Sequence, residues 1–335
     1  MPGRNYQDLF EKFRNLRVIV VGDVMVDAYI LGKVERISPE APVPVVLVEQ
    51  RINRLGGAAN VALNLKSLGA EPILCSVIGN DQKGAEFRQL LAEASIPGEA
   101  VVTSNERITT AKFRVIGNKT QMIRVDEEVT SDLTPADQSL LLGKIRGILE
   151  KSTIHAVILQ DYNKGVLTAD LIHEVIKMAG SHHIPVAVDP KRKNFLQYKG
   201  AALFKPNLKE LREGLGRDIR IDDRKSLEDA ASFLHSKLGI SDVLVTLSEQ
   251  GVFISRREHG GKVVRHFIPA HLRAISDVSG AGDTVISVAT LGLASDLGPM
   301  ELASLANLAG GLVCEEVGVV PVNRDKLLNE SLTLL

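Results

Sequence analysis

The chain has 335 residues, 44% of them hydrophobic and 24% charged, and its 40 Lys and Arg against 41 Asp and Glu give a net charge of -1. This composition excludes global disorder, and the balanced charge argues against nucleic acid or an anionic membrane as a partner. Cys75 and Cys314 lie far apart and outside any CxxC spacing, which argues against a disulfide framework or a zinc ribbon and favours a reducing cytoplasm.

The first segment, 1–17, mixes charged and apolar residues, which predicts an amphipathic helix and not a signal peptide or membrane anchor. The later apolar stretch 285–313 is interrupted by polar residues and a proline, so it lacks the roughly 18 unbroken apolar residues of a membrane span. We therefore expect a soluble, cytoplasmic protein.

Short β-branched runs recur along the chain, and each ends on a polar residue, as is typical of buried parallel strands. They cover 17–23, 155–161, 185–190, 202–207 and 242–248. Other segments have the hydrophobic spacing of helices, namely 58–68, 169–179, 225–238, 281–293 and 299–314. This alternation predicts an α/β fold with a doubly wound, mostly parallel sheet.

Two stretches interrupt that alternation and predict a small antiparallel β lid. Residues 43–49 form an apolar run, and 110–125 read as two alternating strands around a Gly-Asn turn. Because the stretches are far apart in the sequence, we expect one lobe built from insertions at about 30–52 and 107–127. The lobe would belong to a single domain spanning 1–335.

Polar residues end several of the predicted parallel strands: Asp23, Asp161, Asp189 and Asn207. Ligands of open α/β sheets bind beyond the carboxyl ends of the strands, so this pattern predicts a site at that edge. The alternative is that each side chain caps the helix that follows it.

The segment 277–285, DVSGAGDTV, is the strongest motif. Its Gly280, Ala281 and Gly282 form a small-residue turn that leads into a helix, where free amides and the helix dipole would bind an anion. Asp283 follows in the first helical turn, where a carboxylate can accept a proton from an attacking hydroxyl. The alternative is an ordinary helix start capped by an aspartate.

A second motif, RLGGAANVALNLKSLGA at 54–70, begins another predicted helix. Gly56 and Gly57 permit close approach of the backbone to a ligand, and Asn60 offers a donor and an acceptor to a sugar hydroxyl. The chain contains no P-loop, and no GxGxxG follows its first strand, which argues against a dinucleotide enzyme.

The two motifs together resemble the paired signatures of the ribokinase/PfkB family of ATP-dependent sugar kinases. Further matching strings occur in the order typical of that family: GDVMVD at 22–27, VIGNDQKG at 77–84, KPNLKE at 205–210 and TLSEQG at 246–251. The resemblance covers nearly the whole chain. It implies a ribokinase-like fold, ATP and Mg²⁺ as cofactors, and phosphoryl transfer to a sugar.

The resemblance also implies roles at the site of transfer. Asp283 would be the general base, and the amides of the Gly280–Gly282 turn would hold the charge that develops on the phosphoryl group. Asn207 and Glu210 match the family's Asn-x-x-Glu motif, which helps to place Mg²⁺ through water. The alternative for this pair is a capping box at a helix start.

Residues on the nucleotide side follow from the same resemblance. Thr246, Ser248 and Gly251 match the family's nucleotide-side turn, and Asn307 matches a position often found beside adenine. Asp277 is a candidate for the monovalent-cation site, for K⁺, that some members use; alternatively, it only braces the anion-binding loop.

On the sugar side, the resemblance implies that Asp23 or Asp27 binds sugar hydroxyls together with Gly56, Gly57 and Asn60. Asp27 alternatively caps a turn. The lid would close over the sugar and exclude water. Because lids of this family often pair two subunits, the resemblance also implies a homodimer through the β lid.

Four strings resemble the family members that phosphorylate O1 of D-glycero-D-manno-heptose 7-phosphate to the 1,7-bisphosphate, in the synthesis of the ADP-heptose used for lipopolysaccharide. They are 36–46, 161–165, 189–191 and 311–322. One departure is Asn163 in DYNKG, where a glycine is more usual, although asparagine tolerates a positive φ. The chain has no HxGH-type nucleotide-transfer motif, so a stand-alone kinase is expected.

A 7-phosphate requires a basic contact, because arginine forks and lysine ammonium groups bind phosphate. The candidates are Arg36, Lys112, Arg114, Lys164, Lys191 and Arg192, each of which is alternatively a solvated surface charge. Two readings of the function stay open. One is a family member that acts on another sugar or sugar phosphate, and the other is a non-catalytic sugar or nucleotide sensor, which has no need for Asp283.

Overall fold

The computed structural model describes residues 5–258 and 260–335, and its larger sheet has nine strands in the order β13-β12-β11-β10-β9-β8-β1-β4-β5. All pairings from β5 to β11 are parallel, whereas β12 pairs antiparallel with both β11 and β13. The strands are β1 Arg17–Gly22, β4 Glu71–Gly79, β5 Val101–Ser104, β8 Ala156–Gln160, β9 Val186–Asp189, β10 Leu203–Phe204, β11 Asp242–Thr246, β12 Val252–Arg257 and β13 Val263–Ile268.

The predicted doubly wound, mostly parallel sheet is confirmed. Each of the five apolar runs contains one strand, although the run at 202–207 contributes only the two residues of β10. Strands β4, β5, β12 and β13 were not expected. β5 has only four residues, and β13 is a half-exposed edge strand that carries Arg265 and His266, so neither has the apolar run of a central strand.

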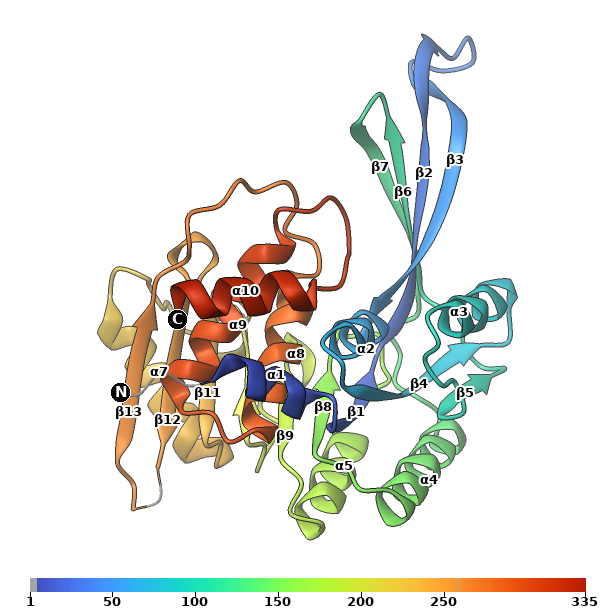
Figure 1. Ribbon diagram of the computed structural model, residues 1–335. Helices are drawn as coiled ribbons and strands as arrows, with labels where there is room; N and C mark the ends of the chain where they lie inside the picture. The colour runs from blue at the N-terminus through green and yellow to red at the C-terminus, as the bar shows by residue number, and fades with distance from the viewer. Residues whose placement is uncertain (1–4, 259) are drawn as a thin grey trace.

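Helices cover both faces of this sheet (Figure 1). They are α1 Tyr6–Phe13, α2 Ala58–Ser67, α3 Gln82–Glu93, α4 Pro135–Lys151, α5 Ala169–Ser181, α6 Leu208–Leu215, α7 Arg224–Leu238, α8 Ala281–Ala294, α9 Pro299–Val313 and α10 Arg324–Leu334. The expected N-terminal helix is confirmed as α1, and residues 1–4 of that expectation lie outside the described residues. No helix in the described ranges has the length and apolar composition that a bilayer span needs.

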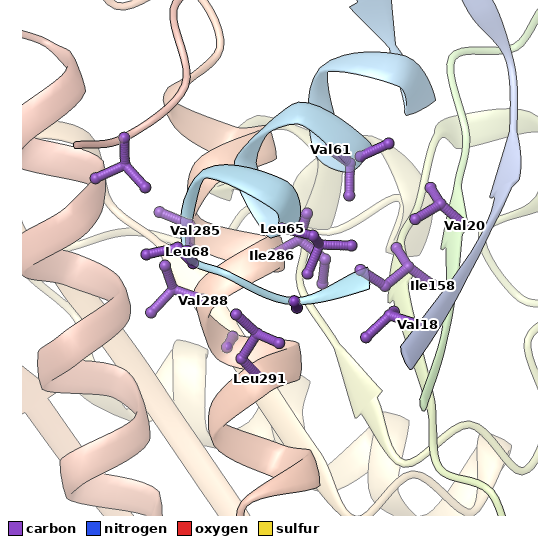
Figure 2. Packing of buried hydrophobic residues seen from close by; sticks show 14 of the residues in the cluster. Val18, Val20, Val61, Leu65, Leu68, Ile158, Val285, Ile286, Val288 and Leu291 are labelled. Atoms are coloured by element: carbon purple, nitrogen blue, oxygen red, sulfur yellow. The ribbon is translucent and has the colours of Figure 1, made fainter. Parts of the chain in front are cut away.

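The core lies on both sides of the sheet because successive side chains of a strand point to opposite faces. In β1, Val18 and Val20 belong to a buried cluster that includes residues of α2, α8 and α9, whereas Ile19 and Val21 belong to a second cluster that includes residues of α4, α5 and α7. Figure 2 shows the first of these clusters, in which Leu65 of α2 and Ile286 of α8 lie between the two helices and to one side of Val18 and Val20 of β1. Continuous burial on two faces explains the unbroken apolar run of β1.

A second, four-stranded sheet projects away from the main sheet (Figure 1), and we call it the lid. It consists of β2 Val24–Ile37, β3 Pro44–Gly57, β6 Ala111–Gly117 and β7 Thr120–Glu127, in the order β3-β2-β6-β7. The β2–β3 and β6–β7 pairs are antiparallel hairpins, and β2 and β6 pair in parallel. Asn118 and Lys119 form the tight turn of the second hairpin with φ of 51° and 66°.

The chain connections join the lid directly to the edge of the main sheet where the sequence places its motifs. β2 starts one residue after Asp23, which follows β1, and β3 ends at Gly57, immediately before α2. The hairpin is therefore longer than the expected segment 30–52. Its two ends lie beside the carboxyl end of β1.

The contact between α2 and α8 generates a stability prediction. Leu65 is 0% exposed in the cluster that joins these helices, and Leu65→Ala leaves a cavity that the packed neighbours fill only in part. We expect the free energy of unfolding to fall by about 2–5 kcal/mol. Urea denaturation checks this value.

The matched control is Leu332→Ala in α10, where the side chain is 51% exposed. We expect the control to change the free energy of unfolding by less than about 0.5 kcal/mol. Equal losses in the two variants would contradict the assignment of Leu65 to the core between α2 and α8.

Candidate active site

Two helix N-termini meet at the carboxyl edge of the main sheet. Gly57 precedes α2 with φ 63°, and Gly280 precedes α8 with φ 83°, conformations that residues with a Cβ rarely adopt. Asn60 in the first turn of α2 donates from Nδ2 to Oδ2 of Asp283 in the first turn of α8, at 2.7 Å. The two motifs of the sequence are therefore in direct contact.

Asp283 is a buried carboxylate with three neutral donors. Besides Asn60, Gln160 Nε2 donates to its Oδ1 at 3.1 Å and the Tyr162 hydroxyl donates to the same oxygen at 2.7 Å. Burial raises the pKa of Asp283 to about 6, although the hydrogen bonds from Asn60 and Tyr162 oppose that rise. Asp283 therefore titrates close to neutral pH, as a general base does.

The predicted anion-binding turn lies beside this carboxylate. Gly280 precedes α8, and Ala281 and Gly282 begin it. First-turn amides of a helix have no acceptor within the helix, and of these the Ala281 amide donates to the Val278 carbonyl at 3.3 Å. The Lys205 ammonium lies 3.7 Å from the position that a Cβ on Gly282 would occupy, and it pairs with Asp189 at 3.1 Å. The turn therefore combines backbone donors with a buried positive charge.

A cleft of about 790 Å³ opens at this turn. Its lining brings together residues that come from distant parts of the sequence, and those expected on the nucleotide side are all among them. The predicted residues in the lining are Lys191, Asn207, Glu210, Thr246, Ser248, Gly251, Gly280, Ala281, Gly282, Asp283 and Asn307.

The Asn-x-x-Glu motif lies at the start of α6, and its Asn207 and Glu210 form a capping box, as in the alternative interpretation of this pair. Asn207 accepts from the Glu210 amide at 2.8 Å, and Glu210 accepts from the Asn207 amide at 2.8 Å. Glu210 also pairs with Lys191. Burial alone would lower the pKa of Lys191, but the charges of Asp189 and Glu210 outweigh it and raise that pKa well above its usual value.

Asp277 braces two loops beside the cleft. Its carboxylate accepts from the Ser279 amide at 2.9 Å and from the Gly318 amide at 3.0 Å. Burial opposes ionisation, but these hydrogen bonds prevail and lower the pKa of Asp277. The arrangement agrees with the bracing alternative, and a monovalent-cation site at Asp277 stays a prediction.

The residues expected on the sugar side lie at the base of the lid. Asp27 in β2 pairs with Arg114 in β6, and a Cβ on Gly56 would collide with the Asp27 carboxylate. Asp23, by contrast, accepts from the backbone amides of Tyr162, Lys164 and Val166 at 2.8–3.0 Å. Asp23 therefore holds a loop of the main domain.

The structure does not bring the six basic candidates together. Three of them have acidic partners: Arg114 pairs with Asp27, Lys191 with Glu210 and Lys164 with Glu128. The remaining candidates are Arg36, exposed near the end of β2, the exposed Arg192, and the half-buried Lys112.

Four residues connected to Asp283 directly or through Asp189 were not assigned a role from the sequence. They are Gln160, Tyr162, Asp189 and Lys205. Gln160 and Asp189 end the neighbouring strands β8 and β9, and Gln160 Nε2 also donates to Asp189 at 3.1 Å. For Asp189, the sequence signal was its position at the end of a predicted parallel strand. Tyr162 follows the strand β8, and Asn163 beside it adopts φ 55°, so the positive φ expected for this asparagine is confirmed.

The chain matches the pfkB family carbohydrate kinase profile over residues 15–326. It is 39% identical to the bifunctional protein HldE of Citrifermentans bemidjiense over an aligned region of 330 residues. That region is 98% of this chain and 66% of the HldE protein. It is 41% identical over 320 residues to the bifunctional protein HldE of Caulobacter vibrioides, which covers 94% and 63%. The chain spans about two thirds of the length of these curated relatives.

Solved structures confirm the fold. Phosphofructokinase-2 from Escherichia coli in complex with potassium superposes with a TM-score of 0.77 at 20% identity, over 95% of this chain and 99% of that chain. Ribokinase from Arabidopsis thaliana, complexed with ribose and ATP, superposes with a TM-score of 0.68 at 18% identity, over 93% and 98%. Because the family profile extends over residues 15–326, the chain belongs to the pfkB family of carbohydrate kinases, phosphotransferases that use ATP and a divalent metal to act on a sugar.

Proposed function

We propose that this chain transfers the ATP γ-phosphoryl group to O1 of D-glycero-D-manno-heptose 7-phosphate, giving the 1,7-bisphosphate. The observation that carries the proposal is Asp283, a buried carboxylate with a pKa of about 6 that lies beside the Gly280–Gly282 turn and is held by Asn60. The resemblance of four sequence strings to heptose-phosphate kinases supports the choice of acceptor. The similarity to the HldE proteins agrees with it.

In the proposed mechanism, Asp283 accepts the proton of the O1 hydroxyl while that oxygen attacks the γ-phosphorus. The bond between the γ-phosphorus and the bridging oxygen breaks, and its electron pair leaves with ADP. The amides of the Gly280–Gly282 turn and the Lys205 ammonium stabilise negative charge on the transferred group. A burial-raised pKa makes Asp283 a stronger base than an exposed aspartate, and it still leaves the group ionised at neutral pH.

The cleft has a donor set that fits a nucleotide-bound Mg²⁺. Asp189 Oδ1 is buried and has no hydrogen-bond partner within the described part of the chain, and Asn207 and Glu210 line the same cleft. No group of three or more His, Cys, Asp or Glu among the described residues forms a complete metal cage. This pattern suits Mg²⁺, which binds one or two carboxylates, water and phosphates. When bound, the ion neutralises phosphate charge.

On the nucleotide side, we assign Thr246, Ser248 and Gly251 to the phosphates and ribose, and Asn307 to the adenine. All four line the cleft, and Asn307 donates from Nδ2 to the Pro269 carbonyl at 2.8 Å, which fixes the direction of its amide. Asp277, which braces the loop before the anion-binding turn, would also serve a K⁺ site if one is used.

On the sugar side, we assign Asp27, Gly56, Gly57 and Asn60 to the sugar hydroxyls. Asp27 retains acceptor capacity while it pairs with Arg114, and Gly56 leaves room for that carboxylate because it has no Cβ. Asp23 contributes indirectly, because its carboxylate is occupied by three backbone amides.

The charged face of the lid supports a site for the 7-phosphate. Directly paired residues of neighbouring strands share a face, which places Lys112 beside Asp27 of β2 and Asp126 of β7. Lys112 is half-buried and has no ion pair among the described residues, and burial lowers its pKa more than these two carboxylates raise it. An anionic ligand would stabilise this ammonium, so we assign Lys112 to the substrate phosphate, with Lys164 nearby.

The opposite face of the lid supports a homodimer. Phe113 and Val115 of β6 pair with Val125 and Ile123 of β7, which gives an apolar face on which Ile123 is 55% and Val125 is 47% exposed. A second copy of the lid would cover this surface by the self-complementary contact of a twofold dimer.

Two other functions would use the same fold: a kinase with a different sugar phosphate as acceptor, and a sensor without catalysis. A different sugar phosphate as acceptor would keep Asp283 and the anion-binding turn, and would change only the contacts on the lid. A sensor without catalysis has no use for a buried base whose pKa lies near neutrality.

The first prediction from the proposed function concerns the base and the acceptor. Asp283→Asn removes the proton acceptor and retains the shape, so we expect kcat to fall about 10²- to 10⁴-fold. ADP release is measured with MgATP and D-glycero-D-manno-heptose 7-phosphate, fructose 6-phosphate, ribose or no sugar. Turnover with another sugar alone would refute the heptose assignment, and an unchanged rate in Asp283→Asn would refute the base.

The second prediction concerns the phosphate contact. Lys112→Ala removes one charged donor, so we expect KM for the heptose phosphate to rise about tenfold or more, while KM for ATP is unchanged. The control Lys237→Ala removes an exposed lysine at the end of α7 and should leave both constants as in the wild type. An unchanged KM in Lys112→Ala would transfer the role to another basic residue.

The third prediction concerns assembly. Ile123→Asp places a charge in the middle of the exposed apolar face of the lid, so we expect a dimeric wild type and a monomeric variant by light scattering. Met300→Asp, at an exposed position of α9 outside the lid, is the control and should remain dimeric. A monomeric wild type would overturn the homodimer.

A further inference from the structure

Tyr162 lies in the cleft between the two halves of the proposed site. Its hydroxyl donates to Asp283 Oδ1 at 2.7 Å, and the Lys191 ammonium lies 5.4 Å from the centre of its ring. The ring lines the cleft together with Asp189 and Gly282. A tyrosine that only filled space would not need its one polar atom directed at the carboxylate that accepts the proton.

The loop that carries this tyrosine, residues 161–166, is held by two buried carboxylates. Asp23 accepts from the amides of Tyr162, Lys164 and Val166, and Asp161 accepts from the Asn163 amide at 2.7 Å. Burial of each carboxylate has a desolvation cost that these hydrogen bonds help to offset, and the Tyr198 hydroxyl also donates to Asp161 at 2.7 Å. The loop is thus held at the backbone on both sides of Tyr162.

The backbone conformation of the loop adds to this constraint. Asn163 and Gly165 have φ of 55° and 87°, and a Cβ on Gly165 would collide with the carbonyl oxygen of Ser131. These left-handed residues turn the chain immediately after Tyr162. As a result, the phenol is directed at α8 by its backbone and not by side-chain packing alone.

We propose that Tyr162 is a positioning residue for Asp283: its hydroxyl fixes Oδ1 and stabilises the ionised carboxylate, which leaves the other lone pairs for the acceptor hydroxyl. This inference rests on the proposed role of Asp283 as the base. Gln160 also donates to Oδ1, but it is shared with Asp189, so Tyr162 is the donor to Oδ1 that is committed to Asp283 alone. Burial holds the pKa of Tyr162 well above its usual value, so the phenol keeps its proton.

The test is Tyr162→Phe, which removes the hydroxyl and retains the ring. Loss of a donor to the charged form raises the pKa of Asp283, and the base must be ionised to act, so the acid limb of the kcat/KM profile moves to higher pH. A rise of about one unit from about 6 lowers the ionised fraction about fivefold at pH 6 and by only about a tenth at pH 8. We therefore expect the variant's deficit to be about fivefold greater at pH 6 than at pH 8.

The matched control is Tyr6→Phe, which removes the same atom from a buried tyrosine of α1 that does not line the cleft. Its pH profile should coincide with that of the wild type. Thermal melting of both variants detects a general loss of structure, and ¹³C NMR titration of the Asp283 carboxyl in the free protein measures the shift without any substrate.

The outcomes separate this inference from the proposed function. If Asp283→Asn is inactive and Tyr162→Phe raises the acid limb and the NMR pKa, the positioning role is supported. If Asp283→Asn is inactive but Tyr162→Phe has the wild-type profile, or loses activity equally at every pH, Asp283 remains the base and the role of Tyr162 is overturned. If Asp283→Asn is fully active, both proposals are overturned.

Discussion

The hydrogen bond between Asn60 and Asp283 is the contact on which the arrangement of the site depends. It joins the first turns of α2 and α8, which are separated by more than half of the chain, and the buried cluster of Leu65 and Ile286 holds the same two helices together. Because the helices are fixed by packing, their N-termini can present backbone donors at a constant separation. The glycine at the start of each helix permits the positive φ that this approach requires.

Burial of opposite charges in one small region determines the chemistry available there. Burial, together with the charge of Asp189, favours the protonated form of Asp283, while the neutral donors and Lys205 favour its charged form. The balance leaves Asp283 with a pKa of about 6. A stronger compensating charge would lower the pKa of Asp283 and make it a weaker base, whereas removal of the donors would raise that pKa. The donors from β8 and the following loop are therefore as important to this balance as the helix start.

The sequence predicts those elements that can be recognised from the residues of a single segment. Strands such as β1 are buried on both faces and read as apolar runs, and the glycine-rich turns read as helix starts. The partners of Asp283 could not be predicted in the same way, because Gln160 and Tyr162 approach it only after β8 and α8 pack together. The edge strand β13 is also beyond such prediction, since its sequence Val-Val-Arg-His-Phe-Ile has neither an unbroken apolar run nor a strict alternation of polar and apolar residues.

The two faces of the lid follow from the alternation of side chains along each of its strands. Along β6, Lys112 and Arg114 point to one face and Phe113 and Val115 to the other. The charged face carries the Asp27–Arg114 pair, and the Arg54 guanidinium beside it donates to the Val319 carbonyl at 3.0 Å, so this face is directed toward the main domain. The apolar face lies on the other side of the sheet, where Phe113 packs against the core and the Lys83 ammonium of α3, while Ile123 and Val125 are exposed. The alternation of side chains along each strand thus gives the lid one charged face and one apolar face.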